Sequence, residues 1–327
     1  CFDMEKEHTI TALEALTEMY GKDRIIAAPG LTYSRSTDAS GIRRAAAEAA
    51  KADVILFFAG EEAVLSGEAH CRADISLPGA QTEMLRALKA TGKPVVTVIM
   101  AGRALTIPEE SKLSDAVLYV FHPGTMGGPA IANLLSGKVN PSGRLPLTMP
   151  RMTGQLPLYY AHNNTGRPAS GIVLIDSLEL EADQTSTGCT SFYLDAGDGP
   201  LFPFGHGLSY TTFKYGPVEL SATEIAPDGS ITASCEITNT GEREGSEVAQ
   251  LYVRDLVGSM VRPVRELKGF EKITLAPGES RKVSFTLDGA DLAYTNAENK
   301  KITEPGEFRL WISPDSQSGE AVSFTVK

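Results

Sequence analysis

The sequence predicts an α/β protein in which a doubly wound, mostly parallel sheet is followed by a β-sandwich. Three observations lead to this fold class. Over residues 1–150, short apolar runs alternate with stretches of helical spacing. Residues 151–213 are rich in Pro, Gly, Tyr and Asn and show little periodicity. Over 214–327, apolar and polar residues alternate with a period of two. We therefore expect an α/β domain, an irregular arm and a β-sandwich with these boundaries.

The strands of the first region are apolar along their whole length, and we expect them at 54–58, 94–100 and 116–121. The helices follow capping and glycine signals: they are expected over 10–20, after an N-cap at Ser40, from Pro78 to Gly92, and from Gly127 to Gly137. Apolar strands separated by helices indicate a parallel sheet that is covered on both faces. Because the chain starts at Cys1, directly before a helix, we expect a missing first strand and a longer parent protein.

The alternating runs of the last region predict its strands, at 231–237, 249–253, 283–287, 308–312 and 322–326. Turn residues separate these runs at 239–241, 277–278 and 305–306. About seven short strands over ~110 residues are typical of a β-sandwich.

Composition excludes several classes of function. The net charge of −11 argues against a nucleic-acid or membrane-surface partner. No run of apolar residues is long enough to span a membrane. The four cysteines contain no C-x-x-C pair, which argues against a zinc site or a disulfide framework. No signal peptide is visible, and the compartment cannot be read from a chain that starts at Cys1.

Candidate functional residues gather in the loops that follow the predicted strands. In an open parallel sheet, ligands bind outside the carboxyl ends of the strands, which here are the loops 60–78, 101–103 and 122–128. The first loop is long and rich in charged side chains: Glu61, Glu62, Glu68, His70, Arg72 and Asp74. Such a loop fits acid/base chemistry, although spacing alone favours a solvated acidic loop with an Arg72–Asp74 pair.

Longer motifs make the chain resemble family 3 glycoside hydrolases. GEEAVLSGEAHCRADISLPGAQTEML (60–85) looks like the stretch that holds the general acid/base in that family. VNPSGRLPLTMP (139–150) and PLFPFGHGLSYTTF (200–213) resemble two further hallmarks. VRPVRELKGFEKITLAPGES (261–280) resembles the fibronectin type III-like domain of the same enzymes. The likeness is closest to β-glucosidases built from a TIM barrel, an α/β sandwich and a fibronectin-like domain.

The resemblance implies a retaining hydrolase that removes terminal β-linked glucose or a related sugar from a β-glucoside or oligosaccharide. It makes Glu68 the general acid/base and Glu61, Arg72, Asp74 and His122 supporting or substrate-binding residues. The nucleophile is then an Asp of the N-terminal barrel, which this chain does not contain, so the fragment alone should be inactive. No metal or cofactor is implied. A homodimer is left open, and the family suggests a periplasmic or secreted protein.

One departure and one alternative accompany this interpretation. The family's third loop usually reads Gly-x-Glu-Gly-Gly, whereas residues 124–128 here read Gly-Thr-Met-Gly-Gly and lack the glutamate. The alternative is a carbohydrate-binding or scaffolding fragment without chemistry of its own. That class usually displays aromatic faces to sugars, but the only tryptophan is Trp311, in an alternating strand where we expect partial burial.

Overall fold

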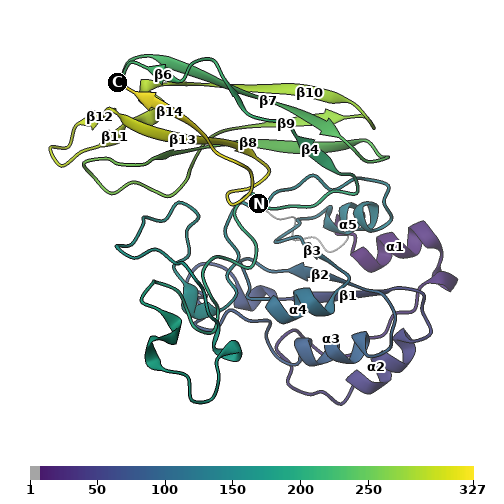
Figure 1. Cartoon of the computed structure of the whole chain (residues 1–327). Helices are drawn as coiled ribbons and strands as arrows, with labels where there is room; N and C mark the ends of the chain where they lie inside the picture. Colours follow the sequence, from purple (N-terminus) through teal and green to yellow (C-terminus); the bar gives the residue numbers. More distant parts are fainter. Residues whose placement is uncertain (1–7) are drawn as a thin grey trace. The chain divides into compact units, whose positions relative to one another are not determined.

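The computed structural model describes residues 8–327, which form two compact units (Figure 1). The first unit extends to Val139 and also includes Met149–Leu156. The second comprises Asn140–Thr148 and Pro157–Lys327. Each unit has a hydrophobic core of its own, so each is described separately below.

The first unit contains a parallel sheet with the order β1 (Ile55–Gly60), β2 (Val95–Met100) and β3 (Ala116–Tyr119). Its helices are α1 (Ala12–Tyr20), α2 (Ile42–Ala49), α3 (Gln81–Lys89), α4 (Pro108–Leu113) and α5 (Gly127–Leu135). Figure 1 shows α1 and α5 on one face of the sheet and α2, α3 and α4 on the other. The predicted parallel sheet with helices on both faces is therefore confirmed.

The ends of the helices show which capping predictions hold. The sequence predicted Ser40 as the N-cap of α2, but Gly41 takes that position. Ser40 instead donates its backbone N–H to Asp38 Oδ1 at 2.9 Å, so the turn before the helix uses it. Gly92 and Gly137 lie just beyond α3 and α5 with φ of 76° and 75°. Glycine adopts this left-handed conformation without strain, so both helix ends agree with prediction.

The edge of β1 borders an open groove. Among residues 8–327, β1 pairs only with β2, which leaves its other edge without a strand. A groove of about 1020 Å³ lies along this edge, lined by apolar residues of β1, of α1 and of the extended segment 25–28. The expected additional strand before α1 stays a prediction.

The second unit is a sandwich of two sheets, as predicted. One sheet has the order β10-β7-β4 with β5 also paired to β7, and the other has the order β6-β14-β13-β8-β9. The strands are β4 (Phe213–Tyr215), β5 (Glu219–Leu220), β6 (Glu224–Ile225), β7 (Ser230–Asn239), β8 (Gly245–Asp255), β9 (Glu266–Leu275), β10 (Ser280–Asp288), β13 (Gly306–Ser313) and β14 (Val322–Val326). A short helix, α6 (Gly289–Leu292), and the small hairpin of β11 (Tyr294–Thr295) and β12 (Lys301–Ile302) complete it. Most neighbouring strands run antiparallel, and their inward-facing apolar residues form the core.

The motif around residues 140–148 is bound into this second unit. The Asn140 side chain donates to Glu244 O at 2.9 Å and accepts from Ser209 Oγ and Tyr210 N at 2.9 and 2.8 Å. Arg144 forms an ion pair with Glu247 of β8, and only 9% and 4% of the two side chains are exposed. The sequence Asn-Pro-Ser-Gly-Arg therefore provides polar anchors for the chain against the sandwich.

Part of the irregular arm packs against the same unit. The ring of Tyr160 stacks on that of Phe204, with centroids 4.4 Å apart, and its hydroxyl accepts from Leu267 N at 3.3 Å. Asn163 forms a β-bridge with Pro263. Residues 160–163 therefore run beside the segment that leads into β9, and Tyr160 is a packing residue of this unit.

Three statements concern residues 8–327 as a whole. None of their helices is both long and apolar enough to cross a bilayer. No group of three or more His, Cys, Asp or Glu side chains among them is arranged to hold a metal ion. Cys71, Cys189 and Cys235 are free thiols, and Cys1 lies outside the described residues.

Candidate active site

The candidate site begins where β1 ends. Gly60 has φ of 136°, and a Cβ there would lie 1.9 Å from Met100 O of the neighbouring strand. Only glycine allows the two strands to approach so closely. The next residue, Glu61, donates its backbone N–H to the same carbonyl at 2.9 Å. The first carboxylate of the loop is therefore fixed directly to the end of the sheet.

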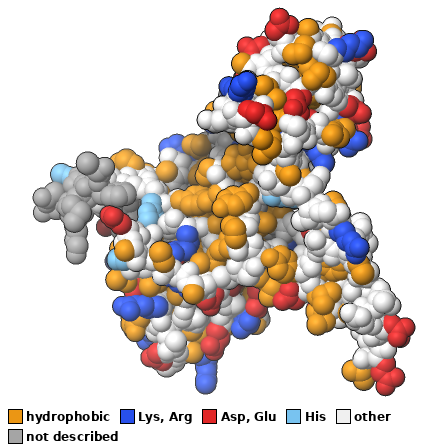
Figure 2. Space-filling model, turned by 90° about the vertical axis from the view of Figure 1, so that its left-hand side faces the viewer, with side chains coloured by type: hydrophobic (Ala, Val, Ile, Leu, Met, Phe, Trp, Pro, Cys, Tyr) orange, Lys and Arg blue, Asp and Glu red, His pale blue; other side chains and the backbone are white. Residues whose placement is uncertain are grey.

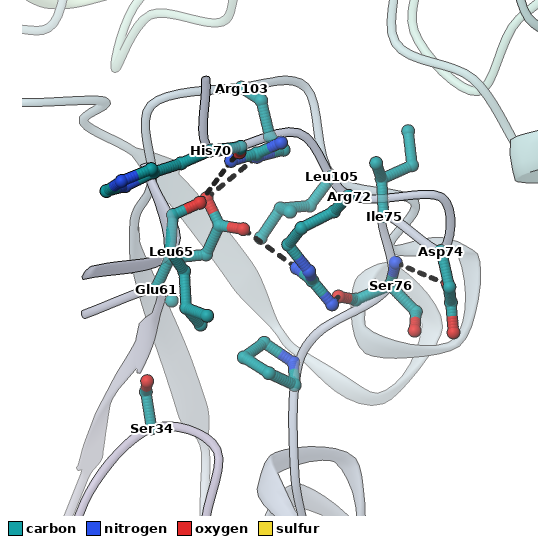
Figure 3. A network of polar contacts seen from close by, with 12 residues as sticks. Ser34, Glu61, Leu65, His70, Arg72, Asp74, Ile75, Ser76, Arg103 and Leu105 are labelled. Carbon is teal, nitrogen blue, oxygen red and sulfur yellow. Dashed lines mark hydrogen bonds and ion pairs between the residues drawn. The ribbon is translucent and has the colours of Figure 1, made fainter. Parts of the chain in front are cut away.

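Glu61 is buried between two arginines (Figure 3). Its side chain has no exposed surface. Arg72 Nη1 lies 2.8 Å from Glu61 Oε1, and Arg103 Nε lies 3.1 Å from Glu61 Oε2. Each carboxylate oxygen thus has its own guanidinium, and charge-assisted pairs of this kind are among the stronger hydrogen bonds in proteins.

Both arginines also hold the backbone of the loop. Arg72 donates to Ser76 O at 3.0 Å. Arg103 donates to His70 O at 2.9 Å and to Leu65 O. The carbonyls of residues 65 and 70 flank Glu68, so Arg103 closes the loop at both sides of the predicted acid/base.

Glu68 itself is exposed at the tip of this loop. No side chain among residues 8–327 forms a hydrogen bond or ion pair with it. Glu62 is paired with Arg35. Asp74 accepts from Ser76 N at 2.9 Å, and this bond, together with the Ser76 hydroxyl and the charge of Arg72, lowers the pKa of Asp74. The described neighbours therefore leave the Glu68 carboxylate free to meet a ligand or another domain.

The pairing of Arg72 decides one alternative left open by the sequence. An Arg72–Asp74 pair would have marked a merely solvated loop. Arg72 instead forms its ion pair with Glu61, while Asp74 forms a tight turn with Ser76. The structure brings Glu61 and Arg72 together and leaves Asp74 exposed beside them (Figure 3).

His122 comes from the third loop and meets the first at Gly102. A Cβ on Gly102 would lie 2.0 Å from Ser66 Oγ and 2.9 Å from His122 Cε1. Loops that follow all three strands therefore converge at this point, and His122 stands exposed at the same edge of the sheet as Glu61.

Three residues that support the site were not singled out from the sequence. Arg103 braces the loop as described. Gln81 is buried at the start of α3, accepts from Gly60 N at 2.8 Å, and donates to Ser34 O and Gly60 O at 2.8 Å. The Tyr119 hydroxyl donates to Arg103 O and accepts from Leu105 N at 3.2 Å. The position of Arg103, just beyond the second predicted strand, was the available signal for it.

Comparison with known proteins identifies the family of the chain. The model of the glycosyl hydrolase family 3 C-terminal domain matches residues 1–210, and that of the fibronectin type III-like domain matches residues 247–316. The chain belongs to glycosyl hydrolase family 3. The β-sandwich is therefore its fibronectin type III-like domain.

Relatives from this family span a much longer sequence. A periplasmic β-glucosidase of Salmonella typhimurium is 46% identical over 86% of this chain and 35% of its own length. A β-xylosidase of Formosa agariphila is 39% identical over 88% of this chain and 37% of its own length. The chain spans about a third of the length of the curated relatives it matches.

Solved structures of the family have the same architecture. A β-glucosidase of Listeria innocua superimposes with a TM-score of 0.87 at 33% identity, over 98% of this chain and 42% of that chain. A β-glucosidase of Erythrobacter marinus gives a TM-score of 0.82 at 34% identity, over 98% of this chain and 43% of that one.

Proposed function

We propose that this family 3 chain supplies the general acid/base of a retaining β-glycosidase, whose nucleophile lies in a barrel domain outside the chain. The observation that carries the proposal is the position of Glu68. It is exposed at the tip of a loop at the carboxyl edge of the sheet, and the loop is fixed on both sides of it by Arg72 and Arg103. An exposed carboxylate on a braced loop suits a group that must reach a substrate bound elsewhere.

Two steps give retention of configuration. In the first, the barrel carboxylate attacks the anomeric carbon while Glu68 protonates the departing oxygen; in the second, Glu68 deprotonates the water that releases the sugar. The two carboxyl groups stand roughly 5–5.5 Å apart in such enzymes. A general acid must hold its proton near neutral pH, and burial raises the pKa of a carboxyl. Closure of the site by the barrel would provide that burial for Glu68.

Exposed apolar surface supports docking of a further domain. Apolar side chains are exposed on the surface in Figure 2. In the loops of the candidate site, Val64 is 56% exposed and Met126 is 62% exposed. Exposed apolar groups that gather beside a polar site are characteristic of interaction surfaces.

The relatives support a proposal for the substrate class. Those named above are a β-glucosidase and a β-xylosidase, and the Listeria innocua β-glucosidase has been solved in complex with glucose and with laminaribiose. We propose a terminal β-linked glucose or a related neutral sugar. The name of the Salmonella typhimurium relative supports a periplasmic or secreted location for the parent protein.

Hydrolysis of aryl β-glycosides by the parent protein and by this chain alone tests the proposal. Only the parent should turn over substrate. In the parent, Glu68→Ala should lower kcat by about 10²- to 10⁴-fold, the range that general acid–base catalysis contributes. Azide should restore part of that loss and yield the β-glycosyl azide, because this anion attacks the glycosyl-enzyme without a general base.

Glu62→Ala is the matched control, since Glu62 lies in the same loop and its carboxylate is already paired with Arg35. It should retain near-parental kcat. Turnover by the isolated chain, or a Glu68→Ala enzyme that azide leaves unchanged, would contradict the proposal.

The non-catalytic sugar-binding alternative loses its main candidate. Trp311 is only 7% exposed, and the guanidinium of Arg265 covers its ring at 4.1 Å from the centroid. No sugar can stack on that face of the ring.

A further inference from the structure

The side chain of Arg103 connects both sides of the Glu68 loop to the end of the sheet. It follows β2, and its guanidinium bonds to Leu65 O, His70 O and the Glu61 carboxylate. Residues 66–69, which include Glu68, therefore form a short arch, and the residues on both sides of this arch bond to the Arg103 side chain. The Arg103 side chain is 22% exposed, so the brace is partly shielded from water.

The arch has a backbone that needs such a brace. Ala69, directly after Glu68, has φ of 63°, and Gly67, directly before it, has φ of 126°. A left-handed conformation is strained for an L-residue with a side chain, and it persists only where the surroundings hold it. The arch is otherwise closed by a single backbone hydrogen bond, from His70 N to Gly67 O at 3.2 Å.

Arg103 is itself fixed from two directions. Glu61, without exposed surface, neutralises its charge from one side. From the other, the Tyr119 hydroxyl bonds to Arg103 O and Leu105 N, which holds the segment 103–105 against β3. A planar guanidinium that serves three acceptors in fixed directions cannot be replaced by the single ammonium of lysine.

We propose that Arg103 is a positioning residue for the general acid/base and sets the place of the Glu68 carboxylate through the carbonyls of residues 65 and 70. This inference rests on the proposed function of Glu68. Arg103 contacts neither the substrate nor the reacting atoms in this proposal. A displacement of about 1 Å at a catalytic group can cost 10²-fold in rate, so loss of the brace should slow proton transfer.

The test uses the parent enzyme and a pair of aryl β-glucosides that differ in leaving group. Phenol is a poor leaving group and needs a proton from the general acid, whereas 2,4-dinitrophenolate departs without one. Arg103→Ala should lower kcat/KM for the phenyl glucoside by about 10²-fold. For the dinitrophenyl glucoside it should lower kcat/KM by no more than about 3-fold, since proton transfer is not required in the step that kcat/KM reports.

Two further variants serve as a conservative substitution and as a matched control. Arg103→Lys keeps the charge but can serve only part of the three acceptors, so its loss on the phenyl glucoside should be intermediate. It also keeps the test valid if Arg103→Ala does not fold. Arg86→Ala is the matched control: it removes another paired arginine of the same unit, one that bonds to Glu109 at 2.5 and 2.7 Å. It should leave both substrates unaffected.

Equal losses on both substrates would show a merely structural role and overturn the inference, as would unchanged kcat/KM on the phenyl glucoside. Glu68→Ala, assayed in parallel, separates this failure from that of the proposed function. If Glu68→Ala shows the leaving-group dependence and azide rescue but Arg103→Ala does not, only the positioning role of Arg103 is wrong. If Glu68→Ala shows neither, the assignment of Glu68 falls and the role of Arg103 falls with it.

Discussion

The Glu61 carboxylate has a structural role in the first unit. It has no exposed surface, and both of its oxygens are bound by arginines that in turn hold the loop. A group so enclosed cannot approach a substrate without breaking these bonds. Its contribution is to keep two guanidinium groups close together at the end of the sheet, where without it their charges would repel each other.

Removal of Glu61 should therefore destabilise the first unit. Glu61→Ala leaves Arg72 and Arg103 partly buried and unpaired, and breaking a buried pair of this kind costs about 3 kcal/mol. Urea unfolding of this chain, followed by circular dichroism of the helices, measures the change. Glu62→Ala is the control: Glu62 and its partner Arg35 are 25% and 58% exposed, so the expected cost is below about 1 kcal/mol. If both variants lower the free energy of unfolding equally, the buried pairs of Glu61 do not stabilise the loop more than an exposed pair does.

The sequence could predict the residues of the loop but not what they bind. Gly60, Glu61, Glu68 and Arg72 belong to one continuous motif, so their common place was readable. Arg103, which pairs with Glu61, and Tyr119, which bonds to Arg103 O, lie 42 and 58 positions beyond Glu61. They reach the site only through the register of β1, β2 and β3. That register depends on the packing of the whole sheet, which no local pattern contains.

At the scale of elements, the hydroxyl of Tyr119 links β3 to the loop that follows β2. Tyr119 bonds to Arg103 O and Leu105 N, and burial raises the pKa of Tyr119 to about 12. The negative charge of Glu61 acts in the same direction as burial, and the positive charge of Arg103 opposes it. The neutral hydroxyl is therefore the form that the folded state requires.

This pKa predicts a loss of stability at high pH. Because the folded pKa lies above the unfolded value of about 10, the contribution of Tyr119 is complete below pH 10 and is lost as pH rises to about 12. The loss amounts to about 2–3 kcal/mol. The difference in unfolding free energy between this chain and Tyr119→Phe should shrink across that window, as measured by urea titration. A difference that stays constant with pH would show that the hydroxyl titrates alike in both states.

Elements with strong periodicity were predictable, and their ends were less so. The three apolar strands were found within two residues of their bounds because buried parallel strands are apolar throughout. The N-cap of α2 was wrong by one position: the Asp38–Ser40 turn occupies the serine that local preference would place at the cap. Alternation with a period of two located β7, β8, β10, β13 and β14 but missed the ten-residue strand β9, whose burial does not alternate regularly. The two-residue strands β5 and β6 are too short to show a period.

At the scale of the whole molecule, the chain passes from the first unit to the second and back before it enters the second unit for good. Residues 140–148 leave the α/β unit and join the sandwich, and 149–156 return. The periodicity of the sequence could not show this excursion. It depends on polar contacts between Arg144 and Glu247, which are more than a hundred residues apart.

The buried ion pair between Arg144 and Glu247 should stabilise the sandwich. Burial raises the pKa of Glu247, Arg144 opposes that shift, and the Tyr215 hydroxyl donates to the second carboxylate oxygen at 2.9 Å. Arg144→Ala would leave this carboxylate buried without a cation, which should cost the sandwich about 3 kcal/mol. Trp311 is the only tryptophan and lies in β13, so its fluorescence during urea unfolding reports on the sandwich alone.

Lys272→Ala is the matched control for that measurement, because Lys272 also bonds to the segment 140–148, at Ser142 Oγ, but is exposed. Its expected cost is below about 0.5 kcal/mol. If Arg144→Ala moves the Trp311 transition no more than Lys272→Ala does, the segment is held by Asn140 and its neighbours instead of by the buried ion pair. If it moves the transition as predicted, the Asn-Pro-Ser-Gly-Arg motif is a structural anchor of the fibronectin type III-like domain, and its presence in the sequence needs no role in the chemistry of Glu68.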